Sequence, residues 1–210
     1  MVYKEAIGVF RMLEEFKSAV KKAQEVNQKL KRKDGFANLT DLVNVVKDVS
    51  GFGKITVSSA DFSEIKNSND VISNAGAMLS TVEKDGKKEA FILLNSKKSA
   101  PIQRFSVAHE LGHLVTNVPN YVYETPNDSK YTLSTLINPD ITYISEDKCK
   151  DDKYNLAEQA ANIFALMVLI PDKIKVTTML DNDVEDLMEK YGVVKEAIYS
   201  RMILSATVDE

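Results

Sequence analysis

The chain has 210 residues, of which 44% are hydrophobic and 28% charged, the composition of a folded globular protein with one or two domains. Its formal net charge of −4 argues against a dedicated nucleic-acid binder, because phosphate contacts need an excess of basic residues. The single cysteine, Cys149, excludes an internal disulfide and fits a reducing compartment.

We expect no targeting or membrane signal. Charged residues interrupt the N-terminal segment, which argues against a signal peptide. The longest apolar run, 164–170, is far shorter than the roughly 20 residues that span a bilayer. We therefore expect a cytoplasmic protein without a membrane segment.

Two helices are expected in the first quarter of the chain. Apolar residues recur at three- and four-residue steps over the first thirty-odd residues, which predicts a long helix ended by Asp34-Gly35. We interpret the basic run 29–33 as the solvated end of this helix, with nucleic-acid contact as the weaker alternative. A second helix is expected to start near Asn38 or Thr40 and to end at Ser50-Gly51.

A β section follows. Strands are expected at 54–60, 75–83 and 89–95. The turn Lys84-Asp85-Gly86 predicts that the last two form a hairpin. The Ser- and Asn-rich stretch 62–74 is expected to be a loop, and 119–153 to be irregular with one short strand at 140–145.

Four further helices are expected, at about 102–117, 153–169, 182–191 and 194–207. The order helices, strands, helices favours an α+β fold, with a small antiparallel sheet packed on helices. We expect three segments: an N-terminal helix (1–36), a central domain (37–181) and a C-terminal helical pair (182–210) packed on that domain.

The motif His109-Glu110-Leu111-Gly112-His113 contains both histidines of the chain. Residues four apart lie on the same face of a helix, so both imidazoles can reach one zinc ion. Glu110 is turned about 100° from His109, where it can take a proton from a metal-activated water. The alternative is a pair of surface or buried, hydrogen-bonded histidines with no metal.

A catalytic zinc needs a third protein ligand and one open position. Because there is no third histidine, the candidates are Cys149 and the downstream carboxylates, of which Glu158 is the best. Glu158 lies in the apolar helix 153–169, where a buried carboxylate needs a partner; the alternative is a solvent-facing side chain. Asn162, one turn later, is expected to hydrogen-bond a ligand.

Two segments carry a family resemblance. RFSVAHELGHLV at 104–115, followed by ExxANxFAxxxxxP at 158–171, resembles the ImmA/IrrE family of zinc metallopeptidases. The resemblance covers about residues 40–205 and implies a compact zincin-like domain of the gluzincin type. It implies that the zinc ligands are His109, His113 and Glu158, and that Glu110 is the general base. Several members of that family cleave a helix-turn-helix repressor, and members are associated with phage and mobile elements.

We therefore expect a zinc-dependent endopeptidase that cleaves a specific cytoplasmic protein, such as a helix-turn-helix repressor of a phage or mobile element. The alternative is a non-catalytic regulatory or toxin–antitoxin-type binding module that retains a metal site. The C-terminal pair has helix-turn-helix-like spacing, but its excess of acidic residues argues against direct nucleic-acid binding. Cys149 is expected to be an exposed thiol, and no tyrosine of the 118–152 insert is assigned a catalytic role.

Overall fold

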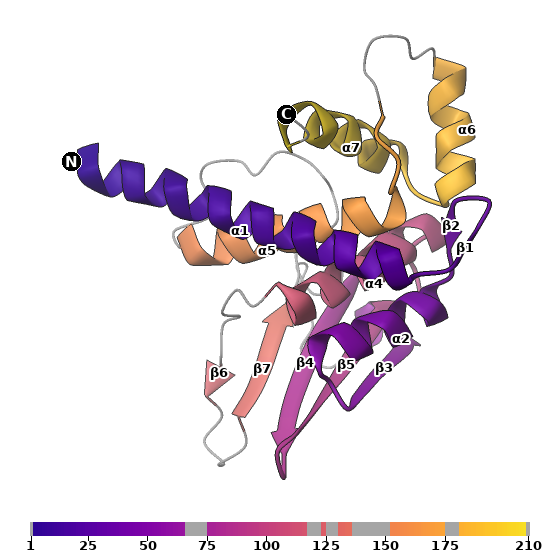
Figure 1. Cartoon of the computed structure of the whole chain (residues 1–210). Coiled ribbons are helices and arrows are strands. Elements are labelled where there is room, and N and C mark those ends of the chain that lie inside the picture. Colours follow the sequence, from indigo (N-terminus) through magenta and orange to yellow (C-terminus); the bar gives the residue numbers. More distant parts are fainter. Residues whose placement is uncertain are drawn as a thin grey trace.

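The computed structural model describes residues 2–65, 75–116, 123–124, 130–135, 152–174 and 181–208. Six α-helices and a five-stranded sheet make up most of this part, which confirms the expected α+β class (Figure 1). The helices are α1 (Val2–Lys29), α2 (Leu39–Ser50), α4 (Ala100–Val115), α5 (Asp152–Leu169), α6 (Asp181–Tyr191) and α7 (Lys195–Val208). The strands are β1 (Arg32–Lys33), β2 (Phe36–Ala37), β3 (Lys54–Ala60), β4 (Ala77–Lys84), β5 (Lys87–Asn95), β6 (Tyr123–Glu124) and β7 (Lys130–Thr135), and a 3-10 turn, η1, covers Phe62–Glu64.

The five-stranded sheet is mixed, with the order β3-β5-β4-β7-β6. Three of its four pairings are antiparallel, as the sequence predicted, including the β4–β5 hairpin at the expected turn. The fourth differs, because β3 runs parallel to β5, from Lys54 opposite Glu89 to Ala60 opposite Asn95. β3 does not pair with β4, the strand that follows it in the chain. It pairs with β5, which runs in the same direction as β3 because the hairpin turn reverses the chain after β4.

The second helix lies where local signals place it. The side chain of Asn38 accepts a hydrogen bond from the backbone N–H of Thr40 at 2.8 Å, which caps the start of α2. Gly51 ends the helix with φ of 75°, a left-handed conformation that glycine adopts without strain.

The first helix ends earlier than predicted. α1 stops at Lys29, and the basic run continues into a two-stranded hairpin, β1–β2. Its turn residues Asp34 and Gly35 have φ of 52° and 86°, and positive φ at both turn positions suits a tight hairpin. The same Asp-Gly pair that was expected to stop a helix therefore forms a hairpin turn, and the prediction of a helix through residue 33 is wrong.

Two strands lie where an irregular stretch was predicted. β7 pairs with β4 from Tyr131 opposite Val82 to Thr135 opposite Met78, and β6 pairs with β7. The hydrogen bonds that stabilise β7 come from a strand about fifty residues away, so the local sequence carries little signal for it. The strand predicted at 140–145, most of the loop predicted at 62–74 and Cys149 lie outside the described residues.

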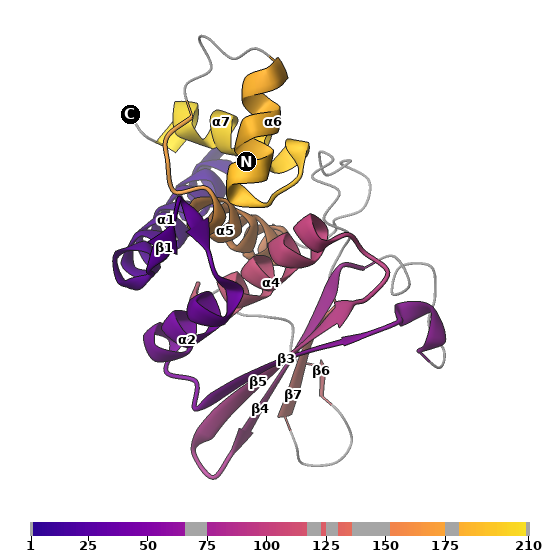
Figure 2. The same cartoon turned by 90° about the vertical axis from the view of Figure 1, so that its right-hand side faces the viewer.

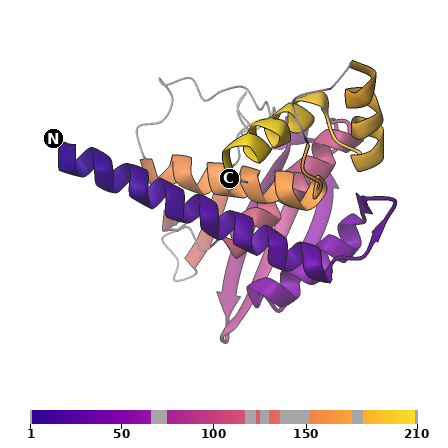
Figure 3. The same ribbon diagram turned by 45° about the horizontal axis from the view of Figure 1, so that its top comes forward.

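The described helices gather on one side of the sheet (Figure 2). α2 and α4 lie nearest to the strands, and α1 runs alongside α5 in the next layer (Figure 3). None of the helices in the described ranges combines the length and the apolar character needed to cross a membrane.

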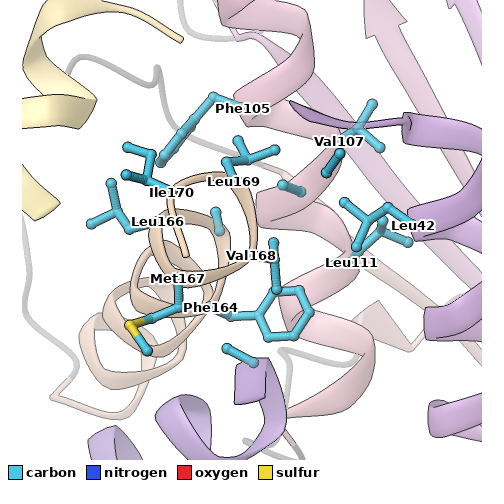
Figure 4. Close-up of a cluster of buried hydrophobic side chains, with 14 of the residues drawn as sticks. Leu42, Phe105, Val107, Leu111, Phe164, Leu166, Met167, Val168, Leu169 and Ile170 are labelled. Carbon is cyan, nitrogen blue, oxygen red and sulfur yellow. The ribbon is translucent and has the colours of Figure 1, made fainter. Parts of the chain in front are cut away.

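One hydrophobic cluster includes residues from α1, α2, β4, β5, α4, α5, α6 and α7. Figure 4 shows its part around α4 and α5, with Leu42, Phe105, Val107, Leu111, Phe164, Leu166, Met167, Val168, Leu169 and Ile170 labelled. The cluster thus draws on all three segments expected from the sequence, and their division at 36 and 181 stays a prediction. The two helices that carry the predicted site residues lie in the middle of this core.

Candidate metal centre

Three side chains able to bind a metal meet between α4 and α5. The Nε2 atoms of His109 and His113 are 3.0 Å apart. Oε2 of Glu158 lies 3.2 Å from Nε2 of His109, and Oε1 lies 3.4 Å from Nε2 of His113. All three residues are buried, and together they form a group that could hold a metal ion.

Helix α4 places the two histidines one turn apart. Pro101 lies in its first turn, where the missing N–H leaves no helical hydrogen bond unmade. The two imidazole rings meet edge to face, at 76° with centroids 4.8 Å apart. Gly112, between them in sequence, faces Ala161 of α5, and this close approach of the two helices brings Glu158 to the histidines.

Asn162 of α5 orients His109. Its Oδ1 atom lies 2.7 Å from Nδ1 of His109. Because an amide oxygen only accepts hydrogen bonds, Nδ1 of His109 donates the proton, and the lone pair of its Nε2 atom is left to face His113 and Glu158. The sequence predicted this contact from Asn162 to a member of the group, and the structure contains it.

The family model described as an IrrE N-terminal-like domain, Peptidase M78, matches residues 54–202, more than half of the chain. The chain belongs to the peptidase M78 family. No curated protein matches the sequence. Membership implies peptidase activity in general and a protein substrate, and peptidases of the M78 family depend on a metal. A group of side chains able to hold a metal ion, His109, His113 and Glu158, is therefore in keeping with the family.

Glu110 is the fourth acidic or basic side chain at this centre of the M78 domain. It is 1% exposed, and its Oε2 atom has no hydrogen-bond partner among the described residues. Burial raises the pKa of Glu110 well above its ordinary value, and the negative charge of Glu158 raises it further. An unpaired buried carboxylate is costly, so the centre needs a positive charge or a donor to complete it.

Burial also affects the pKa values of His113 and Glu158. It lowers the pKa of His113, which favours the neutral imidazole. Burial by itself would raise the pKa of Glu158, but when the rings of His109 and His113 carry protons at Nε2, their hydrogen bonds and charges outweigh burial and lower the pKa to about 2. A neutral imidazole and an ionised carboxylate are the forms that bind metals.

The donor set fits a divalent metal ion. Four-coordinate zinc, with bonds of about 2.0–2.1 Å, separates neighbouring ligand atoms by roughly 3.3 Å, close to the spacings of 3.0, 3.2 and 3.4 Å found here. Two positive charges would also balance the carboxylates of Glu110 and Glu158. Two nitrogens and one oxygen are a donor combination that zinc accepts readily.

Arg104, which no expectation from the sequence singled out, supports the start of α4. Its side chain is 6% exposed, and its Nε donates to the carbonyl oxygen of Tyr191 at 3.1 Å. Its Nη2 donates to the carbonyl oxygen of Ala37. No local pattern marks such a residue, because both acceptors are backbone atoms more than sixty residues away in sequence.

Proposed function

We propose that this member of the M78 family is a zinc-dependent endopeptidase. In this proposal His109, His113 and Glu158 bind the zinc ion and Glu110 is the general base. The observation that carries it is the convergence of the three metal-binding side chains beside a buried carboxylate oxygen that has no partner among the described residues.

When bound, the zinc ion supplies a Lewis acid that activates a water molecule and polarises the scissile carbonyl. Glu110 accepts the proton of the attacking water at its carboxylate and later donates it to the leaving nitrogen. The raised pKa of Glu110 suits this role, since it makes the carboxylate a stronger base than an exposed one. Asn162 holds His109 in the tautomer with a free Nε2.

We further propose that the substrate is a specific cytoplasmic protein, such as a helix-turn-helix repressor of a phage or mobile element. Family membership supports a protein substrate, and the resemblance of the two motifs to ImmA/IrrE proteins motivates the repressor. The net charge of −4 and the single cysteine support a cytoplasmic enzyme that does not itself bind nucleic acid.

Metal analysis of purified protein tests the proposal. We expect about one zinc ion per chain in the wild type and little or none in Glu158→Ala, with Glu185→Ala, an exposed carboxylate on α6, as the matched control. Circular dichroism of each variant checks that it is folded. A wild type that takes up no zinc on reconstitution would contradict the enzyme and favour a non-catalytic binding module. Zinc retained by Glu158→Ala would show that the third ligand lies elsewhere, and Cys149 would be tested next.

A further inference from the structure

The β1–β2 hairpin contacts both helices that carry the metal-binding group. From β1, Nη2 of Arg32 donates to the carbonyl oxygen of Val168, in the last turn of α5, at 2.5 Å. From β2, the carbonyl oxygen of Ala37 accepts a hydrogen bond from Arg104 of α4. Figure 1 shows the hairpin beside the end of α5 and near α4. One short element therefore joins α4 to α5.

The contact with α5 uses carbonyl groups that the helix itself leaves unpaired. The last four carbonyls of an α-helix have no partner within the helix. Nδ2 of Asn27, near the end of α1, donates to the carbonyl oxygen of Met167 at 2.9 Å, next to the carbonyl of Val168 that Arg32 binds. Arg32 and Asn27 also bind each other, with Nη2 of Arg32 2.5 Å from Oδ1 of Asn27. The two side chains therefore bind neighbouring carbonyl groups at the end of α5 and are also bound to each other.

The hairpin contacts α4 through the ring of Phe36. The guanidinium of Arg104 lies over the ring of Phe36, 3.8 Å from its centroid. Burial lowers the pKa of Arg104 to about 10, and the positive charge of Arg32 adds to this effect. Gly192 closes the same corner, because a side-chain carbon there would lie 2.8 Å from the ring of Phe36. Phe36 thus contacts Arg104 and Gly192 although it is 41% exposed.

Helix α1 also packs against the turn of α5 that carries Glu158. Ala19 is fully buried in a small cluster with Ala157 and Ala160, the residues on either side of Glu158 along that turn. Figure 3 shows α1 running beside α5 in this region. α5 is therefore held between α1 and α4.

We propose that Arg32 and Asn27 are positioning residues of the metal centre, which hold α5 against α4 so that Glu158 stays within reach of His109 and His113. Val168 is ten residues from Glu158, about 15 Å along a helix that moves as a rigid element. Both positioning residues lie outside the range 54–202 that matches the family model. The inference rests on the proposed function, since it assumes that the group binds zinc.

Zinc affinity of the full-length protein tests this role. The variants are Arg32→Met, Asn27→Ala and the double variant, with Lys33→Met as control because Lys33 is the exposed neighbour of Arg32 in β1. Affinity is measured by competition with a chromogenic chelator at a temperature where every variant is folded. Cobalt-substituted protein adds a spectrum that reports the geometry of the ligands. Unfolding of the metal-free proteins is measured separately.

We expect Arg32→Met and Asn27→Ala each to weaken zinc binding on the order of 3- to 10-fold and to change the cobalt spectrum. The double variant should be little worse than Arg32→Met, because the two side chains work as one unit. Lys33→Met should match the wild type. Arg32→Lys should fall between wild type and Arg32→Met, because its single ammonium can keep the contacts of Nη2 with Asn27 and Val168 but loses the contact of Nη1 with the carbonyl oxygen of Gly35.

Unchanged zinc affinity and cobalt spectrum in variants that lose only thermal stability would overturn the positioning role and leave the proposed function standing. A wild type that binds neither zinc nor cobalt would overturn the proposed function and this inference with it. If Arg32→Met does not fold, Asn27→Leu gives the same test, because it removes the donor to Met167 and keeps a side chain of similar size.

Discussion

A side-chain carbon on Gly112 would lie 2.9 Å from Cα of Ala161 and 3.0 Å from its carbonyl oxygen. These are backbone atoms, which cannot rotate away as a flexible side chain would. The spacing between α4 and α5 therefore depends on the absence of a side chain at position 112. The same spacing brings Glu158 to the two histidines.

Gly112→Ala should push the two helices apart. In an exposed helix, replacing glycine with alanine stabilises by about 1 kcal/mol. Here we expect the free energy of unfolding to fall by roughly 1–3 kcal/mol, as in other overpacked cores, together with weaker zinc binding. Urea denaturation and zinc titration measure the two effects. Gly53→Ala is the control, because a side-chain carbon there meets its nearest neighbour at an ordinary 3.5 Å. A Gly112→Ala protein more stable than the wild type would contradict the packing argument.

Glu110→Gln should separate catalysis from metal binding. The amide has the size of the carboxylate but cannot accept the proton, so we expect cleavage to slow by about 100- to 10,000-fold. Zinc content should stay at the wild-type level. The metal-free protein should lose little stability, because the amide replaces a buried carboxyl group of the same size whose Oε2 has no partner in the described part of the chain.

Product formation from a substrate that the wild type cleaves, followed by mass spectrometry, measures the effect of Glu110→Gln. Undiminished biological function in this variant would favour the binding-module alternative over the enzyme.

Asn162→Ala should weaken zinc binding without disturbing the core. Removing the acceptor for Nδ1 of His109 frees the ring to turn and to change tautomer, and losses of this kind typically cost 10- to 100-fold in metal affinity. Asn162→Asp keeps an acceptor at the same place and should retain most of the affinity. Gln159→Ala, on the same helix, is the control. Equal zinc affinity in Asn162→Ala and Gln159→Ala would show that His109 needs no such support.

Asp172 gives a pH dependence of stability that does not involve the metal centre. The hydroxyl of Tyr191 donates to its carboxylate, and Lys190 lies 3.0 Å away, and together they lower the pKa of Asp172. A lowered pKa stabilises the fold above the unfolded value of about 3.9 and loses this contribution as the pH falls below it.

Asp172→Asn should therefore be less stable than the wild type at pH 7, by under about 1 kcal/mol because the carboxylate is largely exposed. The difference should shrink as the pH falls from 7 to about 3 and the carboxylate takes up its proton. Thermal unfolding at both pH values measures it. A difference that is independent of pH would mean that the hydrogen bond from Tyr191, rather than the charge, provides the stabilisation.

Local patterns predicted most of the helices. The capping side chain of Asn38, the left-handed Gly51 and the apolar character of α5 act within a few residues, so their signals are visible in the sequence. The errors have a common cause. The parallel pairing of β3 with β5 and the presence of β7 depend on partner strands that are distant in sequence. The end of α1 was misplaced because Asp34-Gly35 suits both a helix stop and a hairpin turn.

The candidate site also has features that local sequence determines and features that depend on the tertiary structure. The sequence by itself determined that His109 and His113 share one face of a helix with Glu110 beside them, because that geometry follows from the helical repeat alone. It could rank Glu158 only as the best third member among several. Its position 3.2 Å and 3.4 Å from the two imidazoles was decided by the tertiary structure. The distance between two helices depends on the residues packed between and around them, here Gly112 against Ala161 and the arginine and asparagine that hold the end of α5, and no local pattern encodes that distance.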